Sequence, residues 1–245
     1  MQTSEPNQIK HWRISKHILE NVNSKVRKLS GLNQWKNTFS TVEWFQNLKD
    51  KKSLHFIQFD IVDFYPSITE NLLQKSLNYA RNFVEISESD ENIIFSCKKS
   101  ILFHDGKPWE KTRNSEFDIT QGSYDGAEIC ELVGLFLLSL LQNFKNSQNL
   151  QYSHFQFGLY RDDGLCCVRL SNRQSEQLRQ QIYNIFHEND LDVKIEANKR
   201  VVDFLDVTFD LQNTTLCSYE EQPSSWNTEK HSEKCQYQVI CFIQP

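Results

Sequence analysis

Two short apolar runs have the length and residue types of buried β-strands. Residues 155–159 and 165–168 are rich in Phe, Leu, Val and Cys, and residues 160–164 between them read Tyr-Arg-Asp-Asp-Gly. An Asp-Gly step between two β-prone runs favours a tight hairpin, because the turn needs positive φ at its central residues. The pattern predicts a β-hairpin that carries Asp162 and Asp163 at its tip.

A third apolar run covers residues 54–60, and we expect it to end at Asp60 and to be stopped by Pro66. Two strands about a hundred residues apart in the chain can pair in one sheet and bring these carboxylates together. Neighbouring carboxylates repel each other unless they share a cation, and hard oxygen ligands suit Mg²⁺. Alone, the hairpin could equally be a solvated acidic turn. Together the acidic residues predict a site for two divalent ions, Mg²⁺ or Mn²⁺, of the kind used in phosphoryl transfer.

Further segments show helical spacing. A stripe from Ile14 to Leu29 is followed by Gly31, which stands where a C-terminal cap belongs, and Ser40 with Glu43 resembles a capping box. Other helices are expected near 69–84, 90–99, 124–145 and 173–189, and short strands near 191–196 and 202–210. This order predicts an α+β fold, in which helices back one face of an antiparallel sheet.

Composition places the chain among intracellular globular proteins. With 245 residues and 38% hydrophobic content it can bury one substantial core. The densest apolar run, residues 133–141, is too short to cross a bilayer and is expected to be a buried helix, so no membrane partner is expected. Polar residues after Met1 and seven cysteines without a Cys-x-x-Cys pair favour an unsecreted protein of the nucleus or cytoplasm.

Charge is distributed unevenly along the chain. The net charge is −5, but residues 1–52 hold ten Lys or Arg against four acids, a local +6 that leaves −11 for the remainder. A basic N-terminal part could supply contacts to nucleic-acid phosphates or to a triphosphate. The alternative is the solvated face of an amphipathic helix. The candidates are Arg13, Lys16, Lys25, Arg27, Lys28 and Lys36.

The order of these motifs resembles the palm of a reverse transcriptase over roughly residues 14–211. Residues 59–65, Phe-Asp-Ile-Val-Asp-Phe-Tyr, resemble the first palm motif, and Thr-Gln-Gly-Ser at 120–123 before a long helix resembles the second. Tyr-Arg-Asp-Asp at 160–163 resembles the third, and residues 194–196 and 202–207 resemble the fourth and fifth. Phe-Tyr-Pro-Ser-Ile after the first aspartate, with Phe-Leu-Asp-Val in the fifth motif, is most similar to Penelope-like and related eukaryotic retroelements.

The resemblance implies roles for individual residues. Asp60, Asp162 and Asp163 would be the catalytic metal ligands. Tyr65 would exclude a 2′-hydroxyl and so select deoxynucleotides; without the motif it would be interpreted as a core aromatic. The implied nucleotide-binding residues are Asp63, Phe64, Tyr65, Gln121 and Gly122, and for Gln121 and Gly122 a polar turn before a helix is the alternative.

Other residues receive weaker assignments. Arg161 could touch the primer backbone or pack outward from the hairpin, and Phe204 and Leu205 of the fifth motif are further candidates for nucleic-acid contact. A general acid for pyrophosphate could be Lys194 or Lys199. Asp125 and Glu128 could face metal, template or solvent, or could cap the long helix, where negative charge suits the helix dipole.

The resemblance also implies an organisation and an activity. Residues 1–52 would form basic helical partial fingers, residues 53–211 the reverse transcriptase palm, and residues 212–245 a polar tail, truncated or degenerate, with little or no thumb. The activity would be RNA-directed DNA synthesis for a retroelement, acting on dNTPs and an RNA or DNA template with a primer. Alternatives are an inert retroelement relic, which binds nucleic acid or nothing, and another two-metal enzyme such as a nuclease. The sequence indicates no oligomeric state.

Overall fold

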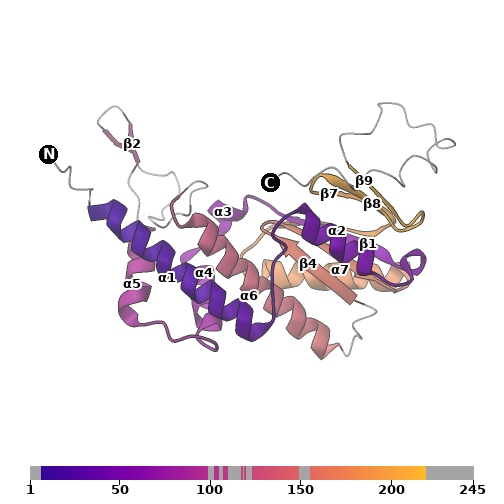
Figure 1. Ribbon diagram of the computed structural model, residues 1–245, viewed down its shortest axis with the longest axis horizontal. Coiled ribbons are helices and arrows are strands. Elements are labelled where there is room, and N and C mark those ends of the chain that lie inside the picture. The colour runs from indigo at the N-terminus through magenta and orange to yellow at the C-terminus, as the bar shows by residue number, and fades with distance from the viewer. Residues whose placement is uncertain are drawn as a thin grey trace. The chain divides into compact units, whose positions relative to one another are not determined.

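The chain forms two compact units in the computed structural model, which describes residues 7–98, 102–104, 107–109, 117, 119, 123–148 and 155–218 (Figure 1). The first unit draws on the described parts of residues 1–34, 61–148 and 182–194. The second draws on those of residues 35–60, 149–181 and 195–245. The expected division into fingers, palm and tail is a separate, functional division and stays a prediction.

A four-stranded sheet, mostly in the second unit, is built from β1 (His55–Ile61), β4 (Phe155–Tyr160), β5 (Asp163–Val168) and β6 (Val193–Lys199). The strand order is β4-β5-β1-β6, and β5 is antiparallel to both β4 and β1. The predicted hairpin is therefore confirmed as β4–β5. The predicted long-range pairing of the 54–60 strand with this hairpin is confirmed as well.

One face of this sheet carries the core of the second unit. Strand alternation places Phe56 opposite Cys167 on that face. The face is covered by α2 (Thr38–Asn47) and by a second antiparallel sheet of β7 (Val201–Phe204), β8 (Val207–Asp210) and β9 (Thr215–Ser218). The buried cluster consists of Phe45, Leu48, Leu54, Phe56, Leu165, Cys167, Val202, Phe204, Val207, Phe209 and Leu211. A short 3₁₀ turn, η1 (Lys51–Ser53), leads from α2 towards β1.

Three details of the second unit differ from the expectation. Residues 202–210 form the β7–β8 hairpin rather than one strand, with Leu205 in the left-handed region at φ 50°. The start of the expected polar tail contains β9, which pairs with β8. The cap of α2 is Asn37, whose side chain accepts a hydrogen bond from the Ser40 amide, so the capping box was placed three residues too late.

The first unit is mainly helical, with α1 (Asn7–Ser30), α3 (Phe64–Ser67), α4 (Glu70–Ala80), α5 (Glu88–Ser96) and α6 (Gly126–Ser147). It also contains the antiparallel pair β2 (Leu102–His104) and β3 (Lys107–Trp109), while α7 (Asn172–His187) has residues in both units. Helix α6 packs against α1 and α4, and most of its apolar residues are buried. The helices expected near these positions are confirmed.

By length and composition alone α6 would also suit a bilayer, since an 18-residue stretch of it has a mean hydropathy of 1.5. However, 56% of that stretch is buried inside the protein. Such a core helix passes the same test without a membrane, so its apolar residues are accounted for by packing in the first unit.

Helix α1 confirms only the middle of the expected stripe, where Val22 and Val26 are buried. Ile14 and Leu29 are 45% and 61% exposed, whereas the polar residues Ser15 and Asn23 are fully buried. Both polar side chains have partners near the start of α6: Ser15 donates to Asp125, and Asn23 donates to the carbonyl of Glu128. Polar pairing with α6 thus fixes the buried face of α1, which apolar periodicity alone did not reveal.

Candidate metal-binding and catalytic site

The three predicted catalytic aspartates lie together at one end of the main sheet, within the second unit. Asp60 is directly opposite Asp163 in the β1–β5 pair, and Tyr160 is opposite Asp163 in the β4–β5 pair. Directly opposed residues share a face, with Cβ atoms about 4.5–5.5 Å apart. Asp162 precedes Asp163 in the turn, and all three aspartates are half-buried. The register therefore gathers the acidic residues that the sequence places a hundred positions apart.

The turn itself differs from the expected Asp-Gly turn. Tyr160 pairs with Asp163, so Arg161 and Asp162 form the two-residue loop, and Arg161 takes the left-handed conformation at φ 54°. Gly164 instead lies within β5, opposite Phe59. A Cβ atom on Gly164 would overlap the Phe59 ring. The glycine is needed because the ring approaches the backbone closely, and the turn-based explanation for it was wrong.

The clustered negative charge acts on Asp163. Burial, together with the smaller effect of the neighbouring charges of Asp162 and Asp60, raises the pKa of its carboxyl to about 6. Among the described residues, no group of three or more His, Cys, Asp or Glu side chains is already arranged as a metal site. The donor chemistry nevertheless fits divalent ions: three carboxylates on adjacent positions repel one another, and Mg²⁺ takes carboxylate oxygens.

Residues beside the acidic turn have mixed environments. Arg161 is exposed, and its guanidinium lies 5.6 Å from the centroid of the Tyr160 ring. Phe204 is only 2% exposed and meets Trp35 edge-to-face at 5.5 Å, so the structure gives it a packing role rather than a surface for nucleic acid. Leu205 is half-buried at the β7–β8 turn. Contacts of Arg161 and Leu205 with nucleic acid stay predictions.

The candidate nucleotide-binding residues after β1 lie in the first unit. The strand ends at Ile61, and left-handed Asp63, at φ 49°, begins the short helix α3, which contains Pro66. Asp63 is exposed, Phe64 is buried, and Tyr65 is half-buried with its ring centroid 6.4 Å from that of Phe64. Their binding roles stay predictions. Gln121 and Gly122 lie outside the described residues.

The two candidate general acids both lie on β6, but in different units. Lys194 is exposed and belongs to the first unit. Lys199 belongs to the second and forms an ion pair with Glu196 on the same strand. Neither placement tests the proton-transfer role, which stays a prediction.

A buried ionic cluster in the first unit was missed from sequence. Asp125 stands at the N-terminus of α6 but makes no capping hydrogen bond. It is 1% exposed and forms an ion pair with Lys98, which is 2% exposed, and it accepts a hydrogen bond from Ser15 at 2.5 Å. Its partners are 27 and 110 residues away, so no local pattern indicates them. Of the roles considered for Asp125, neither capping nor exposure to solvent applies.

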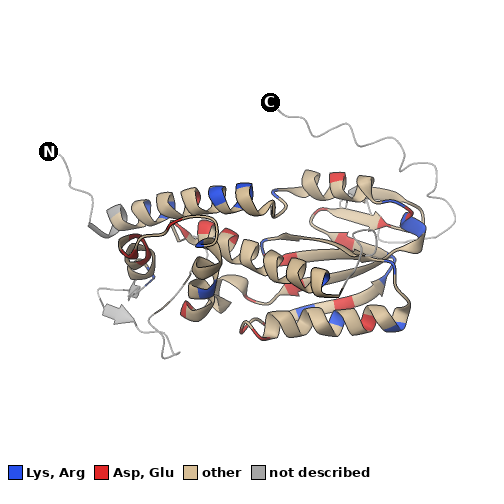
Figure 2. Ribbon diagram, turned by 90° about the horizontal axis from the view of Figure 1, so that it is seen from below, with Lys and Arg blue, Asp and Glu red and all other residues tan. Residues whose placement is uncertain are grey.

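The basic residues of α1 divide into two groups, and Figure 2 shows Lys and Arg recurring along this helix. Lys16 pairs with Glu128 at 3.3 Å, and Arg27 pairs with Glu131, so these two hold α1 against α6. Lys25 and Lys28 are exposed, as is Lys36 beyond the helix. These three exposed lysines remain candidates for contacts with phosphate groups. Glu128, which was considered for metal, template or capping roles, is an ion-pair partner.

Comparison with known proteins identifies the fold. No protein-family model and no curated protein matches this sequence. The chain is similar in structure to telomerase from Candida albicans in complex with a fragment of telomeric RNA, at 15% identity and TM-score 0.63, over 88% of this chain and 39% of the telomerase chain. It is also similar to C-terminally truncated apo telomerase from Candida tropicalis, at 12% identity and TM-score 0.62, over 83% of this chain and 44% of that one.

A second kind of polymerase structure is similar as well. A chain described as an RdRp complex is similar at 10% identity and TM-score 0.58, over 87% of this chain and 20% of that one. The present chain thus spans less than half of the length of these three chains. The mixed helices and antiparallel sheet, with these neighbours, give this chain the fold of a nucleic-acid polymerase palm.

Proposed function

We propose that this chain is the RNA-directed DNA polymerase domain of a retroelement, related to the Penelope-like group. The observation that carries the proposal is the pairing of Asp60 with Asp163, next to Asp162, at one end of a palm sheet. Carboxylates on two adjacent strands are the donor set that two-metal nucleotidyl transfer requires.

The three aspartates would hold two Mg²⁺ or Mn²⁺ ions. When bound, these ions would lower the pKa of the attacking primer 3′-hydroxyl and neutralise the leaving pyrophosphate. The chain's own part is to fix the ligands: the β1–β5 register sets Asp60 against Asp163, and the tight turn sets Asp162 beside them. Positioning and charge neutralisation provide most of the catalysis in phosphoryl transfer.

Substrate choice is the part of the proposal that rests on Tyr65. An aromatic side chain under the incoming sugar would exclude a 2′-hydroxyl and favour dNTPs. Gln121 and Gly122 would contact the nucleotide and the template, and the template would be RNA or DNA carrying a primer. The similarity to the RdRp complex makes ribonucleotide synthesis the competing possibility, and the choice of nucleotide in an assay distinguishes the two activities.

The same proposal includes an intracellular setting. None of the described cysteines, at positions 97, 130, 166, 167 and 217, is part of a disulfide, which supports a reducing compartment. Burial raises the pKa of the Cys166 and Cys167 thiols, which keeps them protonated and unreactive.

Primer extension on an RNA template tests the activity. The wild type should extend a primer with dNTPs in Mg²⁺ or Mn²⁺, and Asp162→Asn should lose at least about a hundredfold in rate, a loss of roughly 2.7 kcal/mol of transition-state stabilisation. Asp190→Asn is the matched control, because Asp190 is exposed and left-handed at φ 60°, a conformation that Asn tolerates.

The alternatives give different results in the same assay. Equal rates for the wild type and Asp162→Asn would overturn the enzymatic proposal and favour an inert relic. Cleavage of the nucleic acid without any nucleotide would indicate a nuclease. Extension with rNTPs but not with dNTPs would indicate that the protein synthesises RNA and not DNA.

A further inference from the structure

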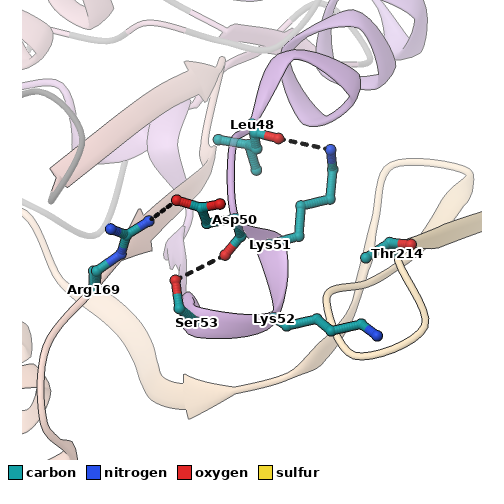
Figure 3. A pocket seen from close by; sticks show the side chains of 7 residues that line it. All are labelled: Leu48, Asp50, Lys51, Lys52, Ser53, Arg169 and Thr214. Atoms are coloured by element: carbon teal, nitrogen blue, oxygen red, sulfur yellow. Dashed lines mark hydrogen bonds and ion pairs between the residues drawn. The ribbon is translucent and has the colours of Figure 1, made fainter.

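A cleft of about 730 Å³ opens in the second unit, beside η1 and the loop between β8 and β9 (Figure 3). Lys51 and Lys52 come from η1, Arg169 follows the end of β5, and Thr214 precedes β9. Three segments far apart in the chain thus supply its walls. All of these residues belong to one unit, so the cleft does not depend on how the units are arranged.

The cleft lies away from the acidic turn. The residues of η1 precede the first residue of β1, His55, which pairs with Val168, whereas Asp60 pairs with Asp163 near the other end of the same two strands. Five residue steps along a strand correspond to about 17 Å. The main sheet therefore carries its acidic cluster at one end and a basic cleft at the other.

The cations of the cleft differ in what they are free to bind. Lys51 donates to the carbonyls of Gln46 and Leu48 at 3.1 and 2.8 Å, and burial lowers the pKa of its ammonium. Its side chain is therefore bound to the backbone and forms part of the wall of the cleft. Arg169 gives one hydrogen bond to Asp50 at 3.0 Å, and its Nε, which is buried, has no partner among the described residues. The Asp50 contact orients the guanidinium and leaves most of its donors unused.

Lys52 is the second cation of the cleft that can contact a ligand. It is exposed, and its ammonium makes no hydrogen bond or ion pair with the described residues. Figure 3 shows Lys52 and Arg169 extending in different directions, on either side of Ser53. With three cations and one carboxylate, the cleft has an excess of positive charge in a chain whose net charge is −5.

The size of the cleft decides between a single anion and a polyanion. A volume of about 730 Å³ is in the range of whole-ligand sites, roughly 300–1,000 Å³, so one phosphate group would leave most of it empty. Two cations that extend apart suit a ligand with charges repeated along its length. Arginine is suited to phosphate because its planar fork matches the phosphate oxygens.

We propose that this cleft binds the sugar–phosphate backbone of a nucleic-acid strand, with Arg169 and Lys52 on two of its phosphates. The hydroxyl of Thr214 lies on the β9 side of the cleft and provides a neutral donor. The site would hold a strand at a distance from the acidic turn, and it requires neither a metal ion nor a nucleotide. The proposed binding site is therefore independent of whether the chain is a polymerase.

The experiment measures binding of a fluorescein-labelled single-stranded oligothymidylate by anisotropy, in EDTA and without nucleotides, over a range of salt concentrations. Each phosphate contact on a single strand contributes about −0.7 to the slope of log K against log salt. The double variant Lys52→Gln/Arg169→Gln should make the slope shallower by about 1.4 and weaken binding about 25-fold near 0.1 M salt. Each single variant should give about half the change in slope.

The control is Lys49→Gln/Arg173→Gln, which removes the same charge from exposed residues of the same unit that do not line the cleft. It should keep the wild-type slope to within a few tenths. Equal losses in both double variants, or no loss in either, would overturn the proposal. Competition by inorganic phosphate as effective, per phosphate, as competition by unlabelled oligothymidylate would identify a small-anion site and overturn it as well.

Discussion

Phe59 covers Gly164 across the β1–β5 pair, one residue before Asp60 meets Asp163. The ring occupies the space that any side chain at position 164 would need. Neighbouring positions of one strand pair thus combine tight packing on one face with the acidic site on the other, because successive side chains point to opposite faces. This packing keeps the two carboxylates in register.

Gly164→Ala should destabilise the protein by about 1–3 kcal/mol, because the added methyl group overpacks against the Phe59 ring. Urea denaturation measures the loss. Phe59→Leu removes the ring, so combining it with Gly164→Ala should cost less than the sum of the two single substitutions. Strict additivity would show that the contact does not cause the loss.

Divalent metal should stabilise the folded protein through the three aspartates. At a Mg²⁺ concentration ten times the dissociation constant, the gain is about 1.4 kcal/mol, seen as a rise in Tm over the EDTA sample. Asp60→Asn should abolish most of this rise, whereas Asp190→Asn should retain it. A rise of equal size in both variants would place the bound metal elsewhere.

The buried Lys98–Asp125 pair should be costly to break from one side. Asp125→Ala leaves the ammonium of Lys98 buried without its partner, and we expect a loss of about 3–5 kcal/mol in the free energy of unfolding. The paired replacement Lys98→Met/Asp125→Leu should cost less than Asp125→Ala alone. Removing the more exposed Lys16–Glu128 pair by Lys16→Met serves as the comparison and should cost about 0–1 kcal/mol.

His55 should contribute a loss of stability on mild acidification. Burial, and then the charge of Arg200, lower the pKa of this imidazole below 6.5, while a hydrogen bond with the backbone of Leu170 opposes the shift. The unfolded chain then binds the proton more readily than the folded one, so stability is full above about pH 6.5 and declines as the pH drops below it. Tm measured at pH 7.5 and 5.5 should differ less in His55→Gln than in the wild type. His187→Gln is the control and should keep the wild-type difference.

Local patterns predicted much of the fold. The hairpin, the long buried helix and the helix expected near 69–84, now α4, all follow from periodicity within a few turns or a few residues of strand. Gly31 ends α1 as expected, at φ 71° with its amide bonded to the carbonyl of Arg27. These features depend on neighbours in sequence, which is why the sequence indicates them.

Long-range contacts decided the rest. The apolar stripe of α1 was wrong at its two ends, Ile14 and Leu29, and it missed Ser15 and Asn23. These two find polar partners at the start of α6, more than a hundred residues away. Strand β9 was not expected, because a short polar segment becomes a strand only when β8 supplies the pairing partner. The basic cleft joins residues 52, 169 and 214, which share no local motif.

The acidic site shows the same division. Local sequence patterns are enough to place carboxylates at a hairpin tip and at the end of a distant strand, since strand alternation and turn chemistry are local. The facing of Asp60 and Asp163, the place of Asp162 in the turn and the room that Gly164 leaves for Phe59 depend on the folded sheet. The physical reason is that a register shift of one residue would move every side chain of a strand to the other face, and packing of the whole sheet fixes that register.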